Sequence, residues 1–133
     1  MSSKDSTQTA AKQLDVIIVG GGFGGMYATY KFREMGMKIQ SFEAGGDLGG
    51  VWYWNRYPGA RCDSDSYIYC FTFDKQLLQE WEWSERYPEQ PEILRYLEHV
   101  AARHDLKRDM QFGTTVTGAR YDDATRLWTG TTS

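Results

Sequence analysis

The chain has 133 residues, about the length of one ordinary domain, and 41% of them are hydrophobic. Its formal net charge of −3 gives no electrostatic reason to expect a nucleic acid or an anionic membrane as partner. No apolar run reaches the roughly 20 residues that a membrane helix needs. Residues 1–13 are polar and lack the apolar core of a signal peptide, so we expect a disordered leader there.

The chain has two cysteines, Cys62 and Cys70, and they do not form a CxxC pair. This spacing fits neither a disulfide framework nor a zinc site, so we expect no metal. Reduced thiols are typical of the cytoplasm, which is the compartment that we expect.

The first half of the sequence predicts a βαβ unit. Residues 15–19 form a predicted strand in which residues 16–19 are all β-branched, which is typical of a parallel strand covered on both faces. Glycines at 20–25 interrupt the run, and residues 24–35 then have helical spacing. A second strand is predicted over residues 37–42, and it ends at Glu43.

The second half predicts further helices and strands after a long loop over residues 45–65. We expect helices over residues 74–83 and 91–104, a strand over 110–121, and a returning strand over 126–132. The predicted fold is α/β, a doubly wound Rossmann-like domain that occupies residues 14–133.

Gly20, Gly22 and Gly25 match the GxGxxG pattern of dinucleotide-binding turns. In that pattern the first glycine permits a tight turn, and the second lets the backbone approach a pyrophosphate. The third lets the helix pack closely, and the helix N-terminus then faces the phosphates. The alternative is a flexible glycine loop, but the flanking strand and helix favour the binding interpretation.

Glu43 ends the second predicted strand, where a carboxylate can accept hydrogen bonds from the ribose of an adenosine. The same charge would repel a 2′-phosphate, so the pattern favours FAD or NAD over NADP. The alternative is an exposed glutamate at a strand end.

The stretch after Glu43 distinguishes FAD from NAD. Residues 49–63 read Gly-Gly-Val-Trp-Tyr-Trp-Asn-Arg-Tyr-Pro-Gly-Ala-Arg-Cys-Asp, which resembles the type I Baeyer–Villiger monooxygenases. The resemblance runs from about Val16 to Trp128. It implies an FAD-binding segment of an enzyme that uses NADPH and O2 to convert ketones into esters or lactones.

The resemblance also implies which residues contact the cofactors. Phe23 would lie at the pyrophosphate, and residues 51–54 would line the flavin and its ribityl chain. Asp63 would bond near the flavin ring, and residues 61–63 would face the nicotinamide. Val116 would meet the adenine through its backbone. The expected cofactor-binding set is Gly20, Gly22, Phe23, Gly25, Glu43, Gly50, Val51, Trp52, Tyr53, Trp54, Arg61, Cys62, Asp63, Tyr69 and Val116.

Other motifs of the resembled family do not occur in this sequence, among them the second glycine-rich motif for NADPH and the catalytic arginine. We therefore expect no catalytic residue here, an inactive isolated chain, and the remaining enzyme portion as a possible partner chain. Two alternatives stay open. One is a fragment of an N-hydroxylating or flavin-containing monooxygenase, against which residues 55–63 argue. The other is a non-catalytic flavin-binding or assembly module.

Overall fold

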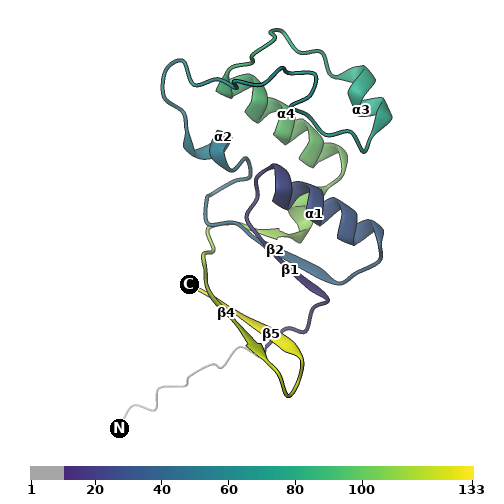
Figure 1. Ribbon diagram of the computed structural model, residues 1–133, viewed down its shortest axis with the longest axis vertical. Helices are drawn as coiled ribbons and strands as arrows, with labels where there is room; N and C mark the ends of the chain where they lie inside the picture. The colour runs from purple at the N-terminus through teal and green to yellow at the C-terminus, as the bar shows by residue number, and fades with distance from the viewer. Residues whose placement is uncertain (1–10) are drawn as a thin grey trace.

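The computed structural model describes residues 11–133, so the predicted leader lies mostly outside the described residues. Figure 1 shows a helical part at one end, a small sheet with one helix in the middle, and a hairpin at the other end. The strands are β1 (Val16–Val19), β2 (Ile39–Phe42), β3 (Met110–Gln111), β4 (Val116–Asp122) and β5 (Leu127–Thr132). The helices are α1 (Phe23–Glu34), α2 (Val51–Trp54), α3 (Lys75–Glu80), α4 (Gln90–Arg103) and the 3₁₀ helix η1 (Leu106–Asp109).

The predicted βαβ unit is confirmed. Strand β2 lies between β1 and β3, and both neighbours run parallel to it. Helix α1 packs on the sheet through Thr29, whose hydroxyl lies 2.7 Å from that of Ser41 on β2. The hydroxyl of Thr29 also donates to the carbonyl of Gly25 at 2.7 Å, so it accepts from Ser41, and this buried polar pair fixes the helix against the strand. The sheet and α1 therefore form a Rossmann-like half, as the α/β prediction requires.

Helix α4 carries the main core, with a buried stripe of Ile93, Tyr96, Leu97, Val100 and Ala101. The apolar spacing predicts a stripe of Ile93, Leu94, Leu97, Val100 and Ala101, because such positions share one face of a helix. Tyr96 lies in the buried stripe, whereas Leu94 is half-buried. Trp81 and Trp83 pack against the same core. Helix α3 is shorter than the predicted 74–83, because the backbone leaves the helical region at Trp81 (ψ 118°).

Two predictions for the loops and strands are wrong. The stretch 110–121 is not one strand, because Gly113 (φ +60°) turns the chain between β3 and β4. Strand β4 then pairs antiparallel with β5 and leaves the parallel sheet. The predicted loop over residues 45–65 contains a one-turn helix, α2, that begins after Gly50.

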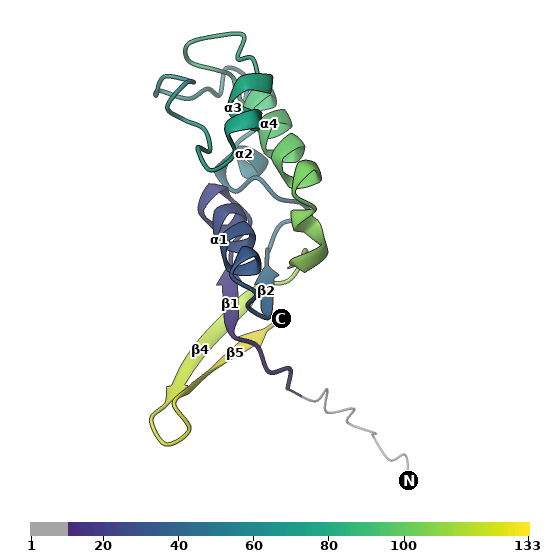
Figure 2. The same ribbon diagram turned by 90° about the vertical axis from the view of Figure 1, so that its right-hand side faces the viewer.

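Strand β1 is also less covered than its sequence predicts. Ile18 faces α1 and is 6% exposed, whereas Ile17 and Val19 are 39% and 66% exposed. Successive strand residues point to opposite faces, so one face of β1 is open. Its second edge has no strand partner within residues 11–133. Figure 2 shows the hairpin at the end of the molecule away from the helices, with β1 between the hairpin and α1.

None of the helices in the described part of the chain is both long enough and apolar enough to span a membrane.

Candidate functional site

The glycine turn joins β1 to α1 in a conformation that few other residues could adopt. Gly20 has φ +100°, and its N–H donates to the carbonyl of Phe42 on β2 at 2.8 Å. A Cβ on Gly25 would lie 1.9 Å from the carbonyl oxygen of Gly20. The first and third glycines of the motif are therefore required by the backbone itself, as their pattern predicts.

The N-terminus of α1 offers unpaired backbone donors. The first intrahelical bond runs from the N–H of Met26 to the carbonyl of Gly22 at 2.9 Å. Within the described residues, the N–H groups of residues 22–25 donate to no protein acceptor. The N-cap, Gly22, provides no side-chain cap. Such a helix end, with its positive dipole, is suited to bind a phosphate.

Glu43 lies directly beneath this turn and is 6% exposed. One carboxylate oxygen accepts from the N–H of Gly21 at 2.5 Å, and the other accepts from Gly45 at 2.7 Å. A Cβ on Gly21 would lie 3.0 Å from the first oxygen. Glu43 therefore holds the turn in shape, and each oxygen keeps a second lone pair for a ligand hydroxyl. Gly21, which the GxGxxG pattern leaves unassigned, is needed for this close approach.

A second glycine pair packs against the first turn. The N–H of Gly49 donates to the carbonyl of Gly21 at 2.9 Å. Gly50 has φ +58°, and a Cβ there would lie 2.9 Å from the α-carbon of Gly22. Residues far apart in sequence thus form one backbone layer without side chains. The sequence indicated Gly50 only through the family resemblance, because nothing in its spacing predicts a contact with Gly22.

Helix α2 is fixed behind this layer by aromatic contacts and hydrogen bonds. Trp52 is buried, and its indole N–H donates to the hydroxyl of Tyr69 at 3.1 Å. The ring of Tyr69 packs edge-on against Phe23 with centroids 4.9 Å apart. The amide of Gln90 donates to the carbonyl of Trp52 at 2.5 Å. Gln90 was missed by sequence reasoning, although its 7% exposure marks it as a buried polar anchor.

The four residues of α2 differ in what they present to a ligand. Val51 and Trp54 are 60% and 61% exposed, so their apolar surfaces are free to contact a flavin. Trp52 is buried and packs in the hydrophobic core. Tyr53 packs over Gly45, and its hydroxyl accepts from Gly46 at 3.0 Å. The structure therefore divides this predicted group into two exposed residues and two supporting ones.

The loop at residues 61–63 lies at a separate hollow of about 340 Å³, which Tyr87 also lines. Arg61 is exposed and is bound by two carboxylates, Glu85 at 3.0 Å and Glu89 at 2.7 Å. Cys62 is buried, and Asp63 is exposed. The side chain of Asp63 is therefore exposed and takes no part in the ion pairs of Arg61.

Val116 begins β4, close to the end of β2. The N–H of Thr114 donates to the carbonyl of Glu43 at 3.0 Å. This bond fixes the start of the hairpin near Glu43, the residue expected to bind the ribose. Val116 itself lines an apolar groove beside β1. The structure thus brings together the glycine turn, Glu43, α2, Phe23 and Tyr69. It places residues 61–63 and Val116 at two separate hollows.

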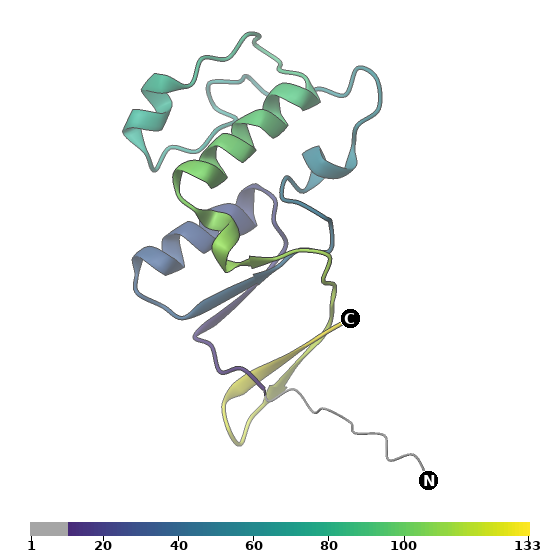
Figure 3. The same ribbon diagram turned by 180° about the vertical axis from the view of Figure 1, so that it is seen from behind.

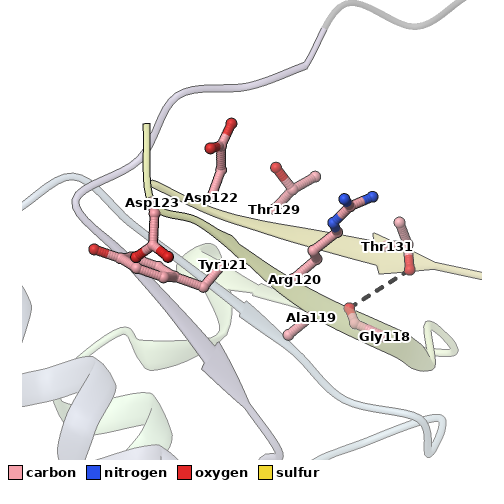
Figure 4. Close-up of a pocket in the computed structure, with 8 residues that line it drawn as sticks. All are labelled: Gly118, Ala119, Arg120, Tyr121, Asp122, Asp123, Thr129 and Thr131. Carbon is pink, nitrogen blue, oxygen red and sulfur yellow. Dashed lines mark hydrogen bonds between the residues drawn. The ribbon is translucent and has the colours of Figure 1, made fainter. Parts of the chain in front are cut away.

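The hollow on the hairpin contains none of the predicted cofactor-binding residues. It has a volume of about 800 Å³. Figure 4 shows the residues that line it, among them Arg120, Asp122 and Thr129. All its lining residues come from β4, β5 and the turn between them, away from the glycine turn. No three His, Cys, Asp or Glu side chains gather into a metal site anywhere in residues 11–133.

Comparison with known proteins agrees with this site. Residues 18–81 match the NAD(P)-binding Rossmann-like domain family. A Baeyer–Villiger monooxygenase from Pseudooceanicola batsensis is 46% identical over 125 residues, which cover 93% of this chain and 23% of that protein.

This chain is related to the Baeyer–Villiger monooxygenases.

Solved structures of such enzymes agree in fold. A steroid monooxygenase bound to NADP superposes with a TM-score of 0.90 at 54% identity, over 91% of this chain and 23% of that one. The enzyme OTEMO in complex with FAD and NADP superposes with a TM-score of 0.86 at 44% identity, over 92% of this chain and 23% of that one. The chain therefore spans about a quarter of the length of these Baeyer–Villiger relatives.

Proposed function

We propose that residues 14–133 form the FAD-binding segment of an NADPH- and O2-dependent Baeyer–Villiger monooxygenase that oxidises ketones to esters or lactones. One observation carries the proposal: the free N–H groups at the start of α1 lie beside the buried carboxylate of Glu43. This arrangement suits a pyrophosphate next to a ribose, the two linked groups of an adenine dinucleotide.

The residues of the chain fit FAD at each part of that molecule. Gly22 and Gly50 pack backbone against backbone, which would hold the N–H donors at the start of α1 in place for the pyrophosphate. The negative charge of Glu43 disfavours the 2′-phosphate of NADP at this position. The exposed surfaces of Val51 and Trp54 provide apolar contacts for a flavin ring. When bound, FAD would supply the redox chemistry, accepting a hydride from NADPH and passing electrons to O2.

The protein's own contribution is to bind and orient. The α1 N-terminus would bind the pyrophosphate, and Glu43 would accept hydrogen bonds from the ribose hydroxyls. Asp63, exposed beside the hollow at Tyr87, would accept a hydrogen bond near the flavin ring. Arg61, held by Glu85 and Glu89, would face the approaching nicotinamide. Val116 would meet the adenine through its backbone.

The catalytic groups and most of the NADPH site would belong to the remaining enzyme portion, whether on the same polypeptide or on a partner chain. We place the enzyme in the cytoplasm, because Cys62 and Cys70 are both free thiols.

Titration of purified chain with FAD, followed by flavin fluorescence, tests the proposal. We expect FAD to bind more tightly than NAD or NADP. FMN is the matched control ligand, because it shares the flavin but lacks the adenosine and the pyrophosphate. We expect FMN to bind at least tenfold more weakly than FAD, the equivalent of about 1.4 kcal/mol. Tighter binding of NADP than of FAD, or equal binding of FMN and FAD, would contradict it.

A further inference from the structure

Gln90 is the first residue of α4, and both its backbone N–H and its side-chain amide bind segments outside that helix. The first N–H groups of a helix have no partner within it, and the N–H of Gln90 donates to the carbonyl of Ala60 at 2.8 Å. The side-chain amide donates to the carbonyl of Trp52 on α2 at 2.5 Å. Gln90 is 7% exposed. A buried amide in this position is held firmly, because an unpaired amide in the interior costs free energy.

Helix α2 depends on contacts of this kind. It has four residues, and a single helical turn is not stable alone. The carbonyl of Trp52 accepts from no backbone N–H within residues 11–133, so the amide of Gln90 supplies its partner. Leu94 on α4 packs beside Gly49, where a Cβ would lie 2.8 Å from the Cδ1 atom of Leu94. Figure 3 shows α2 beside the end of α4 at which that helix begins.

The start of α4 also holds the loop at residues 60–62. The N–H of Cys62 donates to the carbonyl of Pro88 at 2.9 Å. Arg61 and Glu89 form an antiparallel bridge, and their side chains are paired at 2.7 Å. Residues 88–90 therefore fix two surfaces at once: the surface of α2 that we expect to contact the flavin, and the loop that we expect to face the nicotinamide.

We propose that Gln90 is a positioning residue, which holds the exposed surface of α2 in a fixed place relative to residues 61–63 and thereby determines where the flavin ring lies. The inference rests on the proposed function. Gln90 acts through α2, because its amide is bound to the carbonyl of Trp52. The adenosine half of FAD would bind at the glycine turn, where Gly49 keeps its own bond to Gly21 at 2.9 Å. The effect of Gln90 is therefore confined to the flavin half.

Three variants test this role. Gln90→Met keeps the length of the side chain and removes the amide. Gln90→Asn is a milder variant, because it keeps the amide and shortens the side chain by one methylene. Gln40→Met is the matched control. The amide of Gln40 on β2 also donates to backbone carbonyls, those of Ser41 at 3.2 Å and Asp109 at 3.1 Å, and it binds no residue of α2.

Hydrogen exchange of the chain without ligand is the first measurement. The N–H groups of Trp54 and Asn55 close the turn of α2, at 3.1 Å and 2.9 Å from their acceptors. We expect both to exchange roughly tenfold faster in Gln90→Met, and to a smaller extent in Gln90→Asn, while the N–H groups within α1 keep their rates. Gln40→Met should leave the α2 rates unchanged. Unchanged α2 rates in both Gln90 variants would overturn the proposal.

Titration with FAD, FMN and ADP is the second measurement. We expect Gln90→Met to weaken FAD and FMN binding alike, by roughly three- to tenfold, and ADP binding by less than about twofold. ADP carries the adenosine and the pyrophosphate without the flavin, so a general loss of structure would weaken all three ligands. Equal weakening of ADP and FAD would therefore overturn the proposal, as would an equal effect of Gln40→Met on FAD. Absence of FAD binding in the parent chain would contradict the proposed function, and the exchange rates would still decide whether Gln90 holds α2.

Discussion

The α-carbon of Gly25 faces the carbonyl oxygen of Gly20, so closely that a Cβ on Gly25 would lie 1.9 Å from that oxygen. Gly20 directly follows β1, and Gly25 lies in the first turn of α1. Neither can move without opening the βαβ unit. The third glycine of the motif is therefore a packing requirement even before any ligand is considered.

Gly25→Ala should accordingly destabilise the fold by at least about 2 kcal/mol, because overpacking of rigid backbone is not easily relieved. Gly24→Ala is the control, since a Cβ at Gly24 would meet nothing within 4 Å. That variant should leave stability unchanged or raise it by up to about 1 kcal/mol. Urea unfolding of the two variants measures the difference, and equal stabilities would refute the packing argument.

The contrast between these glycines shows what the sequence could predict. The βαβ unit, most of the α4 stripe and the position of Glu43 at a strand end follow from local spacing. Short segments of sequence determine both the apolar period and where a strand ends. The contact between Gly22 and Gly50 joins residues 28 positions apart, and no local pattern specifies it. The open face of β1 could not be predicted either, since its apolar sequence indicates burial on both faces. The sequence does not predict the turn at Gly113, because a single glycine within a strand-like run is also compatible with a bulge.

Glu43→Ala should weaken FAD binding by ten- to a hundredfold, the loss of about 1.5–3 kcal/mol that follows removal of a charged acceptor. Glu43→Gln should cost less, because it keeps one oxygen for the N–H groups that Gly21 and Gly45 donate. Both variants should also lose some stability for the same reason. Flavin titration and unfolding of each variant are compared with Glu98→Ala, an exposed position on α4. Unaltered FAD affinity in Glu43→Ala would show that the ribose assignment is wrong.

Tyr69→Phe should reduce stability by about 1 kcal/mol, because the indole N–H of Trp52 would lose its acceptor. Tyr67→Phe is the matched control: its hydroxyl donates to Asp65 at the surface, and the residue is 69% exposed. We expect that control to change stability by less than about 0.5 kcal/mol. Tryptophan fluorescence during unfolding reports both variants. A larger loss for Tyr67→Phe than for Tyr69→Phe would contradict the proposed support of α2.

Asp74 should make the helical part sensitive to acid. Burial alone would raise the pKa of Asp74, but Arg103 at 2.6 Å, the N–H of Leu77 at 3.0 Å and His104 at 3.0 Å outweigh it. The pKa falls from 3.8 to about 2. A carboxyl with a lowered pKa stabilises the fold above its unfolded pKa, and that contribution is lost as pH falls toward about 2.

We therefore expect the parent to lose stability between about pH 4 and pH 2, and Asp74→Asn to lose less over the same interval. Because other carboxyls also titrate there, the quantity to compare is the difference between parent and variant in urea unfolding at each pH. Glu98→Gln serves as the control. Parallel losses in the parent and Asp74→Asn would exclude Asp74 as a source of the acid sensitivity.

The isolated chain should bind FAD without oxygenating a ketone. Hydride transfer needs NADPH held against the flavin, and this sequence contains no second dinucleotide motif. Oxygen insertion also needs a cation in a site that excludes water. The two loop arginines cannot meet that need here. Arg61 is paired with Glu85 and Glu89, and Arg56 is exposed, its Nε donating to the carbonyl of Tyr53 at 2.7 Å.

With NADPH, O2 and a cyclic ketone, we therefore expect hydrogen peroxide and no lactone from the chain alone. Gas chromatography of the product and a peroxide assay measure the two outcomes. A chimera in which this chain replaces the matching segment of the steroid monooxygenase is the positive control, because it restores the matched segment to a whole enzyme. Lactone from the isolated chain would contradict the fragment interpretation. Lactone only after the remaining enzyme portion is added as a separate chain would instead support an enzyme assembled from two polypeptides.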